Sequence, residues 1–193
     1  VPVEVKKKKE TVIVDTDEGP RRGLTIEKLQ KLRPCFVDGG TVTAGNSSSL
    51  NDAAGAVVIM SADKAKELGV KPLLKIEGLA VAGFDGALMG YSPKLSSEKL
   101  AKQLNLDLRS IDMFEINEAF ASQSVAVSRD LGLDMSKVNI YGGGISIGHP
   151  IGATGCILTV KVLYELCRSD KKDAMISMCI GGGQGISMYV TKC

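Results

Sequence analysis

The sequence is poor in metal ligands and in excess charge. It has one histidine, and its five cysteines form no C-x-x-C pair. Such scattered ligands lack the spacing of zinc sites, so no metal centre is predicted, and the odd, unpaired cysteine set is typical of a reducing compartment. A net charge of +2 gives no electrostatic basis for binding nucleic acid or an anionic membrane surface.

Long hydrophobic runs are also missing. No apolar run approaches the roughly 18 residues that a membrane-spanning helix needs, and no signal-peptide pattern is present. We therefore expect a cytoplasmic protein without membrane contact. The chain begins Val1-Pro2-Val3, within an apparent strand or loop, which favours processing or truncation.

The 193 residues are 44% apolar and 24% charged, which suits a soluble globular protein with one sizeable core. The first 40 residues contain too few apolar side chains to form a domain alone. The remaining pattern alternates strands and helices, and it predicts a layered α/β sheet, mostly parallel or mixed, with helices on both faces. Strands are expected at residues 11–15, 54–60, 73–82, 113–116, 138–141, 174–180 and 186–190, and helices at 26–32, 62–68, 96–104, 118–131 and 150–168.

The last helix and the last two strands carry specific expectations. The helix at 150–168 is apolar nearly all round, so it should be central and should leave a large apolar patch or cause association if uncovered. The two final strands are expected to pair antiparallel across the glycines at 181–185.

Three polar side chains of the last third stand where apolar runs end, and we expect them to converge on one pocket. His149 precedes Pro150, a residue suited to the first turn of a helix, so free backbone N–H groups should favour a neutral imidazole. A structural histidine satisfied by backbone is the alternative, but the neighbouring glycines, which let a substrate approach, favour function.

Cys179 ends an apolar strand, before glycines whose N–H groups can form an anion-binding nest. The thiol could act as nucleophile or acid/base, or it could be a small buried hydrophobe. Asn117 follows a strand and is expected at the N-cap of the next helix, where its amide either only caps or holds a water or carbonyl. The glycines at 143–148 match the outer spacing of a P-loop, but His149 stands in place of the lysine, so phosphate binding is weakly supported.

Four segments together resemble the thiolases, in the order and spacing of that family, and the resemblance extends over the whole chain. They are Thr-Val-Thr-Ala-Gly-Asn-Ser-Ser at 41–48, Asn-Glu-Ala-Phe at 117–120, Gly-His-Pro-Ile-Gly-Ala at 148–153 and Cys-Ile-Gly-Gly-Gly at 179–183. The similarity is greatest to the biosynthetic acetyl-CoA acetyltransferase branch. It implies a layered α-β-α fold with a mixed, mostly parallel five-stranded sheet. It also implies that 1–50 end a loop domain, 51–72 return to the core of the N-terminal half, and 73–193 form the C-terminal domain.

The resemblance implies a role for each site residue. Cys179 would remove the α-proton of a second acetyl-CoA, and His149 would activate a nucleophilic cysteine and donate to the thioester oxyanion. Asn117 would fix the water that completes this oxyanion hole, and the Gly181 N–H would serve a second one. The coenzyme A and pantetheine tunnel would be lined by Ser48, Phe36, Ala44, Met89 and Phe120.

One departure from the family is large. The acyl-accepting cysteine of thiolases lies in a first half that has no counterpart here, and none of the five cysteines stands in that motif. The expectation is thus an acetyl-CoA C-acetyltransferase fragment, which condenses two acetyl-CoA to acetoacetyl-CoA and CoA without metal or bound cofactor. It should be inactive without the missing N-terminal half and a homotetramer at full length.

Three alternatives remain open at this stage. The first is a degradative 3-ketoacyl-CoA thiolase, which differs in the chain length of its substrate. The second is a non-catalytic, CoA-binding half that completes a partner subunit. The third is a hydrolase that uses Cys179 with His149.

Overall fold

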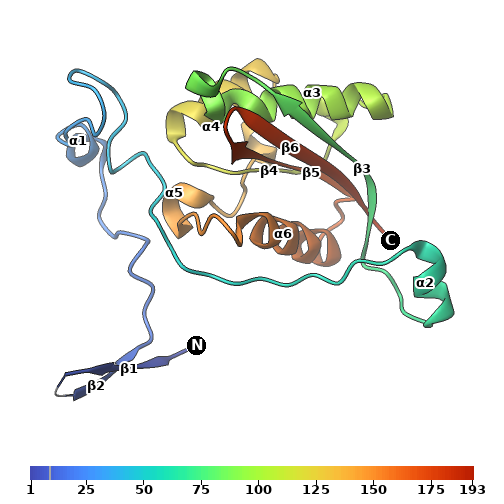
Figure 1. Cartoon of the computed structure of the whole chain (residues 1–193), viewed down its shortest axis with the longest axis horizontal. Helices are drawn as coiled ribbons and strands as arrows, with labels where there is room; N and C mark the ends of the chain where they lie inside the picture. Colours follow the sequence, from blue (N-terminus) through green and yellow to red (C-terminus); the bar gives the residue numbers. More distant parts are fainter. Residues whose placement is uncertain (9) are drawn as a thin grey trace.

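The computed structural model describes residues 1–8 and 10–193, and a four-stranded sheet forms its centre. The strands lie in the order β3 (Leu74–Gly83), β6 (Gln184–Lys192), β5 (Asp173–Gly181) and β4 (Phe114–Ile116). Figure 1 shows α3 (Ser92–Leu104) and α4 (Ala121–Asp130) on one face and α6 (Thr154–Arg168) on the other. The predicted α/β class with helices on both faces is confirmed.

The details of the sheet differ from the prediction. Only β4 and β5 pair in parallel, whereas β3 with β6 and β5 with β6 are antiparallel, so the sheet is mixed but not mostly parallel. The sheet also has four strands instead of five. Residues 138–141 contribute a single bridge, between Val138 and Phe114, because Asn139 adopts a left-handed backbone (φ 47°) that ends the pairing.

The strand predicted at 54–60 is absent, and the buried environment expected for it is absent too. These residues are exposed and form no strand in the described structure. An apolar run becomes a strand only when another strand satisfies its backbone groups. Nothing in the described part of this chain supplies that partner.

The predicted antiparallel pair at the end of the chain is confirmed as the β5–β6 hairpin. Its turn contains Gly181, Gly182 and Gly183, with φ values of 92°, 57° and 78°. A side chain at Gly183 would also collide with the backbone at Phe84 and Gly86. Glycine is therefore required here both by conformation and by space.

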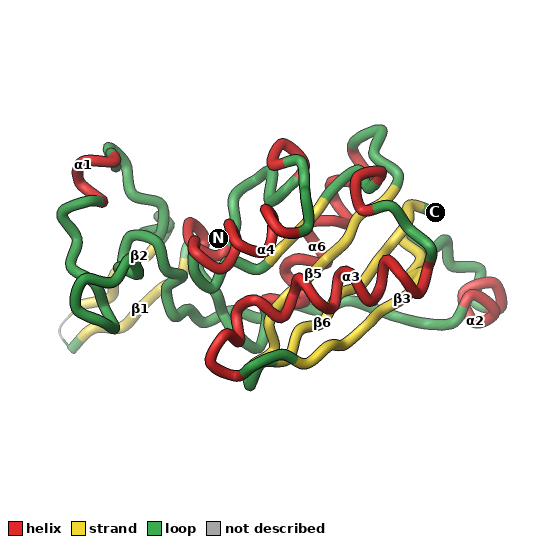
Figure 2. Tube along the Cα trace, turned by 90° about the horizontal axis from the view of Figure 1, so that it is seen from above, coloured by secondary structure: helices red, strands yellow, loops and turns green. Residues whose placement is uncertain are grey.

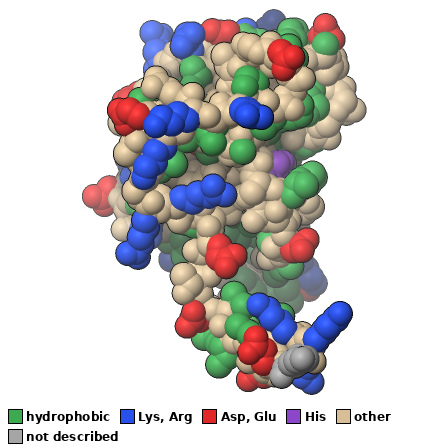
Figure 3. Space-filling model, turned by 90° about the vertical axis from the view of Figure 1, so that its left-hand side faces the viewer, with side chains coloured by type: hydrophobic (Ala, Val, Ile, Leu, Met, Phe, Trp, Pro, Cys, Tyr) green, Lys and Arg blue, Asp and Glu red, His purple; other side chains and the backbone are tan. Residues whose placement is uncertain are grey.

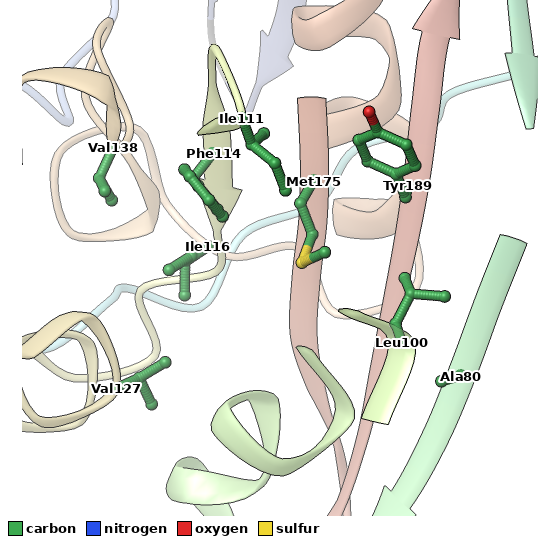
Figure 4. Packing of buried hydrophobic residues seen from close by; sticks show 9 residues of the cluster. All are labelled: Ala80, Leu100, Ile111, Phe114, Ile116, Val127, Val138, Met175 and Tyr189. Carbon is green, nitrogen blue, oxygen red and sulfur yellow. The ribbon is translucent and has the colours of Figure 1, made fainter. Parts of the chain in front are cut away.

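Two apolar clusters fill the spaces on either side of the sheet. One lies between the sheet and helices α3 and α4, and Figure 4 shows its members: Ala80, Leu100, Ile111, Phe114, Ile116, Val127, Val138, Met175 and Tyr189. The other packs against α6 and includes Met113, Leu158, Val162, Leu166, Ala174, Ile176 and Val190. Full burial of one such side chain stabilises the fold by about 1.5–3 kcal/mol.

Three helices begin at other residues than predicted. α3 starts at Ser92, four residues early, because Pro93 presets its first turn. α4 starts at Ala121, because its N-cap Phe120 is extended and bridges Ser47. α6 starts at Thr154, after a turn whose first carbonyl, that of Pro150, accepts from the N–H of Ala153 and of Thr154.

Helix α6 is also less central than predicted. Leu158, Val162 and Leu166 are buried against the sheet, but Tyr164 on the same helix is 65% exposed. Figure 1 shows the extended segment before α2 running along α6. A Cβ at Gly55 in this segment would lie 2.9 Å from Cys156 Sγ, so the segment passes close to the helix. α6 is therefore an outer layer with partial cover.

The N-terminal third lies beside this body and is largely exposed. Strands β1 (Val3–Lys7) and β2 (Glu10–Val14) form an antiparallel hairpin, followed by α1 (Ile26–Leu29) and, after the extended segment, α2 (Ala62–Glu67). Figure 2 shows α2 at the opposite end of the molecule from the hairpin. The predicted exposed strand at 11–15 and the helix at 62–68 are confirmed within one residue at each end, whereas the helix predicted at 26–32 ends already at Leu29. The remaining elements are short: η1 (Gly86–Tyr91), η2 (Leu108–Ser110), η3 (Met135–Lys137) and α5 (Gly144–Ile147).

Candidate active site

The loop that follows α5 carries His149 to the edge of the sheet. Gly148 turns the chain at φ 90°, and the next backbone N–H, that of His149, donates to the carbonyl of Ser49 at 3.1 Å. The imidazole is half-buried. Its Nδ1 lies 2.7 Å from Thr154 Oγ1, and its Nε2 lies 3.2 Å from Asn117 Nδ2.

These contacts define the protonation of the ring. Thr154 Oγ1 donates its hydrogen to the Pro150 carbonyl at 3.0 Å, so it accepts from His149 Nδ1–H. The lone pair on Nε2 then accepts from the Asn117 amide. Burial lowers the pKa of His149, because the charged imidazolium loses hydration. The site therefore holds a neutral imidazole whose Nε2 can take a proton.

Asn117 is buried directly after β4, but it is not a helix cap as predicted. Phe120 occupies the N-cap of α4, and the backbone N–H of Asn117 donates to the carbonyl of Ser177 in β5 at 2.9 Å. This bond continues the parallel pairing of β4 and β5 by one residue. The side chain is free to reach His149 because a strand end, not a helix, fixes the backbone.

Cys179 and Gly181 lie at the end of the neighbouring strand. Cys179 is two residues beyond Ser177, and its half-buried Sγ accepts from the Gly181 N–H at 3.4 Å. Carboxyl ends of parallel strands share one edge, so this thiol and Asn117 belong to the same edge of the sheet. No hydrogen bond joins His149 to Cys179 within 1–8 and 10–193. The structure thus brings Asn117 and His149 into contact and places Cys179 and Gly181 on the adjacent strand.

The side chain of His149 lines a cleft. The cleft measures about 550 Å³ and is lined by Leu50, Asn51, Asp52, His149 and Ile151. Figure 3 shows the histidine, in purple, visible from outside among hydrophobic neighbours. Among the described side chains, no three of His, Cys, Asp or Glu gather as metal ligands would.

Three of the five predicted tunnel residues lie together. The rings of Phe36 and Phe120 meet edge to face with centroids 6.0 Å apart, and the N–H of Ser48 donates to the Ala119 carbonyl at 3.0 Å. Ala44 is exposed in the same loop. Met89, 41% exposed, lies on η1, whose Gly90 packs on Gln123 of α4.

Two residues that support the site were not predicted from the sequence. Thr154 orients the imidazole, as described above. Glu118 accepts from the backbone N–H of Ile145 at 3.2 Å and from Asn139 Nδ2 at 2.8 Å, so its carboxylate fixes the glycine loop. The only sequence signal for either is proximity to Asn117 or His149, which does not specify a contact.

Two family models together match most of the chain. Residues 70–192 match the family model "Thiolase, C-terminal domain", and residues 1–63 match "Thiolase, N-terminal domain". The chain belongs to the thiolase family. The predicted family membership is confirmed.

Individual thiolases are similar to this chain over all or nearly all of its length. The acetyl-CoA acetyltransferase of Pseudomonas aeruginosa is 48% identical over 192 residues, which are 99% of this chain and 49% of that protein. The crystal structure of the Bacillus anthracis acetyl-CoA acetyltransferase superposes with a TM-score of 0.92 at 43% identity, covering 100% of this chain and 49% of its own. Human mitochondrial 3-ketoacyl-CoA thiolase gives 0.87 at 42% identity, with 100% and 49% covered. The chain thus spans about half the length of the thiolases it matches.

Within the described residues, none of the helices combines the length and the apolar character that a bilayer crossing requires.

Proposed function

We propose that this chain is the C-terminal part of an acetyl-CoA C-acetyltransferase, which reversibly condenses two acetyl-CoA to acetoacetyl-CoA and CoA. The supporting observation is the contact between His149 and Asn117 at the sheet edge that also carries Cys179. A neutral imidazole and a thiol at one edge suit the two proton transfers that this condensation needs.

In the first half-reaction, His149 Nε2 takes the proton of a cysteine thiol that the missing N-terminal half supplies. The thiolate attacks the acetyl-CoA carbonyl, and the C–S bond to coenzyme A breaks. The proton on His149 passes to the departing CoA thiolate, which leaves an acetyl-cysteine. Asn117 orients the imidazole and holds the water that completes the oxyanion hole.

In the second half-reaction, the Cys179 thiolate removes the α-proton of a second acetyl-CoA. The resulting enolate attacks the acetyl-cysteine carbonyl and acetoacetyl-CoA forms. The cysteine thiolate that leaves takes up the proton now on Cys179, so the cysteine thiol and the Cys179 thiolate are both restored. The Gly181 N–H, next to the Cys179 sulfur in the structure, would stabilise the negative oxygen. One such donor contributes on the order of 3 kcal/mol.

The remaining assignments complete the proposal. Ser48, Phe36, Ala44, Met89 and Phe120 would contact the pantetheine and coenzyme A of substrates, and no metal or bound cofactor takes part. Residues 1–50 would end the loop domain, 51–72 would return to the N-terminal-half core, and 73–193 would form the C-terminal domain. The full-length protein would be a cytoplasmic homotetramer.

Thiolysis of acetoacetyl-CoA by CoA tests the proposal. We expect no turnover from this chain alone and normal turnover from the longer protein that includes the N-terminal half. In that protein, Cys179→Ala and His149→Ala should each lower kcat by about 10³-fold or more, whereas Cys167→Ala, at an exposed cysteine, should not. Full activity of the isolated chain, or of the Cys179→Ala protein, would overturn the assignment.

A degradative 3-ketoacyl-CoA thiolase is the second candidate, favoured by the structural likeness to the human enzyme of that name. A series of 3-ketoacyl-CoA substrates separates the two, because a degradative enzyme accepts long chains. If the longer protein is inactive on all of them but the chain binds CoA and co-purifies with another polypeptide, the chain is instead a non-catalytic half.

A further inference from the structure

A buried ion pair lies beneath the candidate active site and takes no part in the chemistry above. Glu115 in β4 is 0% exposed, and the side chain of Lys161 in α6 is 17% exposed. Lys161 Nζ donates to Glu115 Oε2 at 2.6 Å and to the carbonyl of Gly142 at 2.7 Å. One ammonium group therefore connects a helix, a strand and the glycine loop.

Stability alone does not explain this pair. Burying two charges costs hydration, and well-packed apolar side chains of similar volume are often as stabilising or more so. The carboxylate is also incompletely satisfied, because Glu115 Oε1 has no hydrogen-bond partner. Burial raises the pKa of Glu115 and the charge of Glu118 adds to this, while Lys161 opposes the rise.

The pair is connected to both segments that carry the site, the strand end with Asn117 and the loop with His149. Glu115 is two residues before Asn117 in the same strand end. Gly142 begins the loop that continues through α5 and Gly148 to His149. The preceding residue, Tyr141, is also held by α6, because its hydroxyl donates to Glu165 Oε2 at 2.9 Å. The start of the loop is thus attached to α6 by two consecutive residues.

We propose that Lys161 is a positioning residue that fixes the loop carrying His149 against the strand carrying Asn117. Without the ammonium bridge, the Gly142 carbonyl and the Glu115 carboxylate would no longer share a partner, and the contact between imidazole and amide would loosen. The effect of this bridge on catalysis rests on the proposed function, but its effect on the contact between the His149 imidazole and the Asn117 amide does not.

The test uses the only histidine of the chain as a spectroscopic probe. The double variant Lys161→Met/Glu115→Gln removes both charges and so leaves no unpaired ion in the core. Lys94→Met is the matched control, because it removes a partly buried lysine paired with Glu98 on α3, which covers the opposite face of the sheet from α6. NMR titration gives the pKa of His149, circular dichroism reports the fold, and hydrogen exchange follows the backbone N–H groups of Gly148 and His149.

We expect the double variant to fold, the pKa of His149 to rise toward its ordinary value, and exchange at Gly148 and His149 to quicken about tenfold while the N–H of Met175 in the sheet is unaffected. Lys94→Met should change none of these. A folded double variant with an unaltered pKa and unaltered exchange at His149 would show that the pair is only structural.

If the double variant does not fold, Lys161→Arg decides. It keeps a charge for Glu115, but its planar head cannot hold both oxygen atoms in the same geometry. A perturbed His149 signal in a folded Lys161→Arg chain supports the proposal, and an unperturbed signal overturns it. None of these readouts needs turnover, so an inactive longer protein would defeat the proposed function without affecting this inference.

Discussion

Asn117 and His149, 32 positions apart in the sequence, are joined by a contact of 3.2 Å between the amide Nδ2 and the imidazole Nε2. The contact links the end of β4 to a loop that follows α4 in the sequence. Because Thr154 occupies the opposite ring nitrogen, the imidazole is held from both sides. A ring fixed in this way has a defined tautomer, and its contacts can be tested directly through the pKa of His149.

The first prediction concerns the charge next to the ring. Asn117→Asp would place a carboxylate beside Nε2, and an adjacent negative charge stabilises the imidazolium, so the pKa of His149 should rise. NMR titration of the single histidine measures this. Asn105→Asp, at an exposed position after α3, is the control and should leave the pKa unchanged. An equal pKa in the wild type and Asn117→Asp would show that the two side chains do not meet in solution.

The second prediction is a pH dependence of stability. The pKa of His149 is below its ordinary 6.5, so the unfolded chain binds more protons than the folded chain as the pH falls below that value. The contribution of His149 to the free energy of unfolding is fully present above pH 6.5, and it declines as the pH falls toward the lowered pKa. His149→Gln removes the contribution, so its melting temperature should fall less between about pH 7.5 and about pH 5.5 than that of the wild type. Identical slopes would contradict the assignment of a buried neutral imidazole.

The third prediction compares two glycines of the histidine loop. A Cβ at Gly148 would overlap the side chain of Asn51, and its φ of 90° disfavours other residues. Gly148→Ala should lower the free energy of unfolding by about 1–3 kcal/mol. A Cβ at Gly152 meets nothing within 4 Å, so Gly152→Ala should be nearly neutral. Denaturant unfolding measures both, and equal effects would mean that the loop does not pack as described.

The fourth prediction concerns the far end of α6. Lys171, Arg168 and Tyr141 all donate to the buried Glu165, and the Lys171 hydrogen bond is the largest cause that lowers its pKa to about 2. This stabilisation is present above pH 4.5 and is lost as the pH falls toward about 2. Glu165→Gln should cost on the order of 1–2 kcal/mol at neutral pH. The difference from the wild type should disappear in strong acid.

Glu67→Gln provides the control for that experiment. Glu67 is paired with Lys64 in the exposed helix α2, where an ion pair contributes little. Its unfolding free energy should match the wild type within about 0.5 kcal/mol. A loss as large as that of Glu165→Gln would mean that burial does not distinguish the two carboxylates.

The sequence indicates candidate site residues, but it does not give their arrangement. Asn117, His149 and Cys179 are candidates because each stands where an apolar run ends, and strand ends meet at one edge of a sheet. The supporting contacts of Thr154 and Lys161 could not be predicted, because they depend on how α6 lies across the sheet. Their sequence context is that of ordinary helix residues.

The errors in the sheet have equally local causes. The apolar pattern at 138–141 is that of a strand, but Asn139 turns the backbone and uses its side chain to bond both the N–H and the carbonyl of Ile116. The pattern at 54–60 is also that of a strand, yet Val58 remains 87% exposed. Periodicity identifies a segment that can pair but does not say whether a neighbour is present.

The hydrogen bond from the His149 N–H to Ser49 connects two parts of the chain that the family treats as separate modules. The residues at 51–60, which follow Ser49, are exposed and form no strand or helix, so a protease could cut them without touching the sheet. Such a cut would spare every side chain of the C-terminal module but would leave Ser49, the anchor of its histidine, on a separate fragment held only by non-covalent contacts. The boundary between the modules is therefore not a boundary of the site.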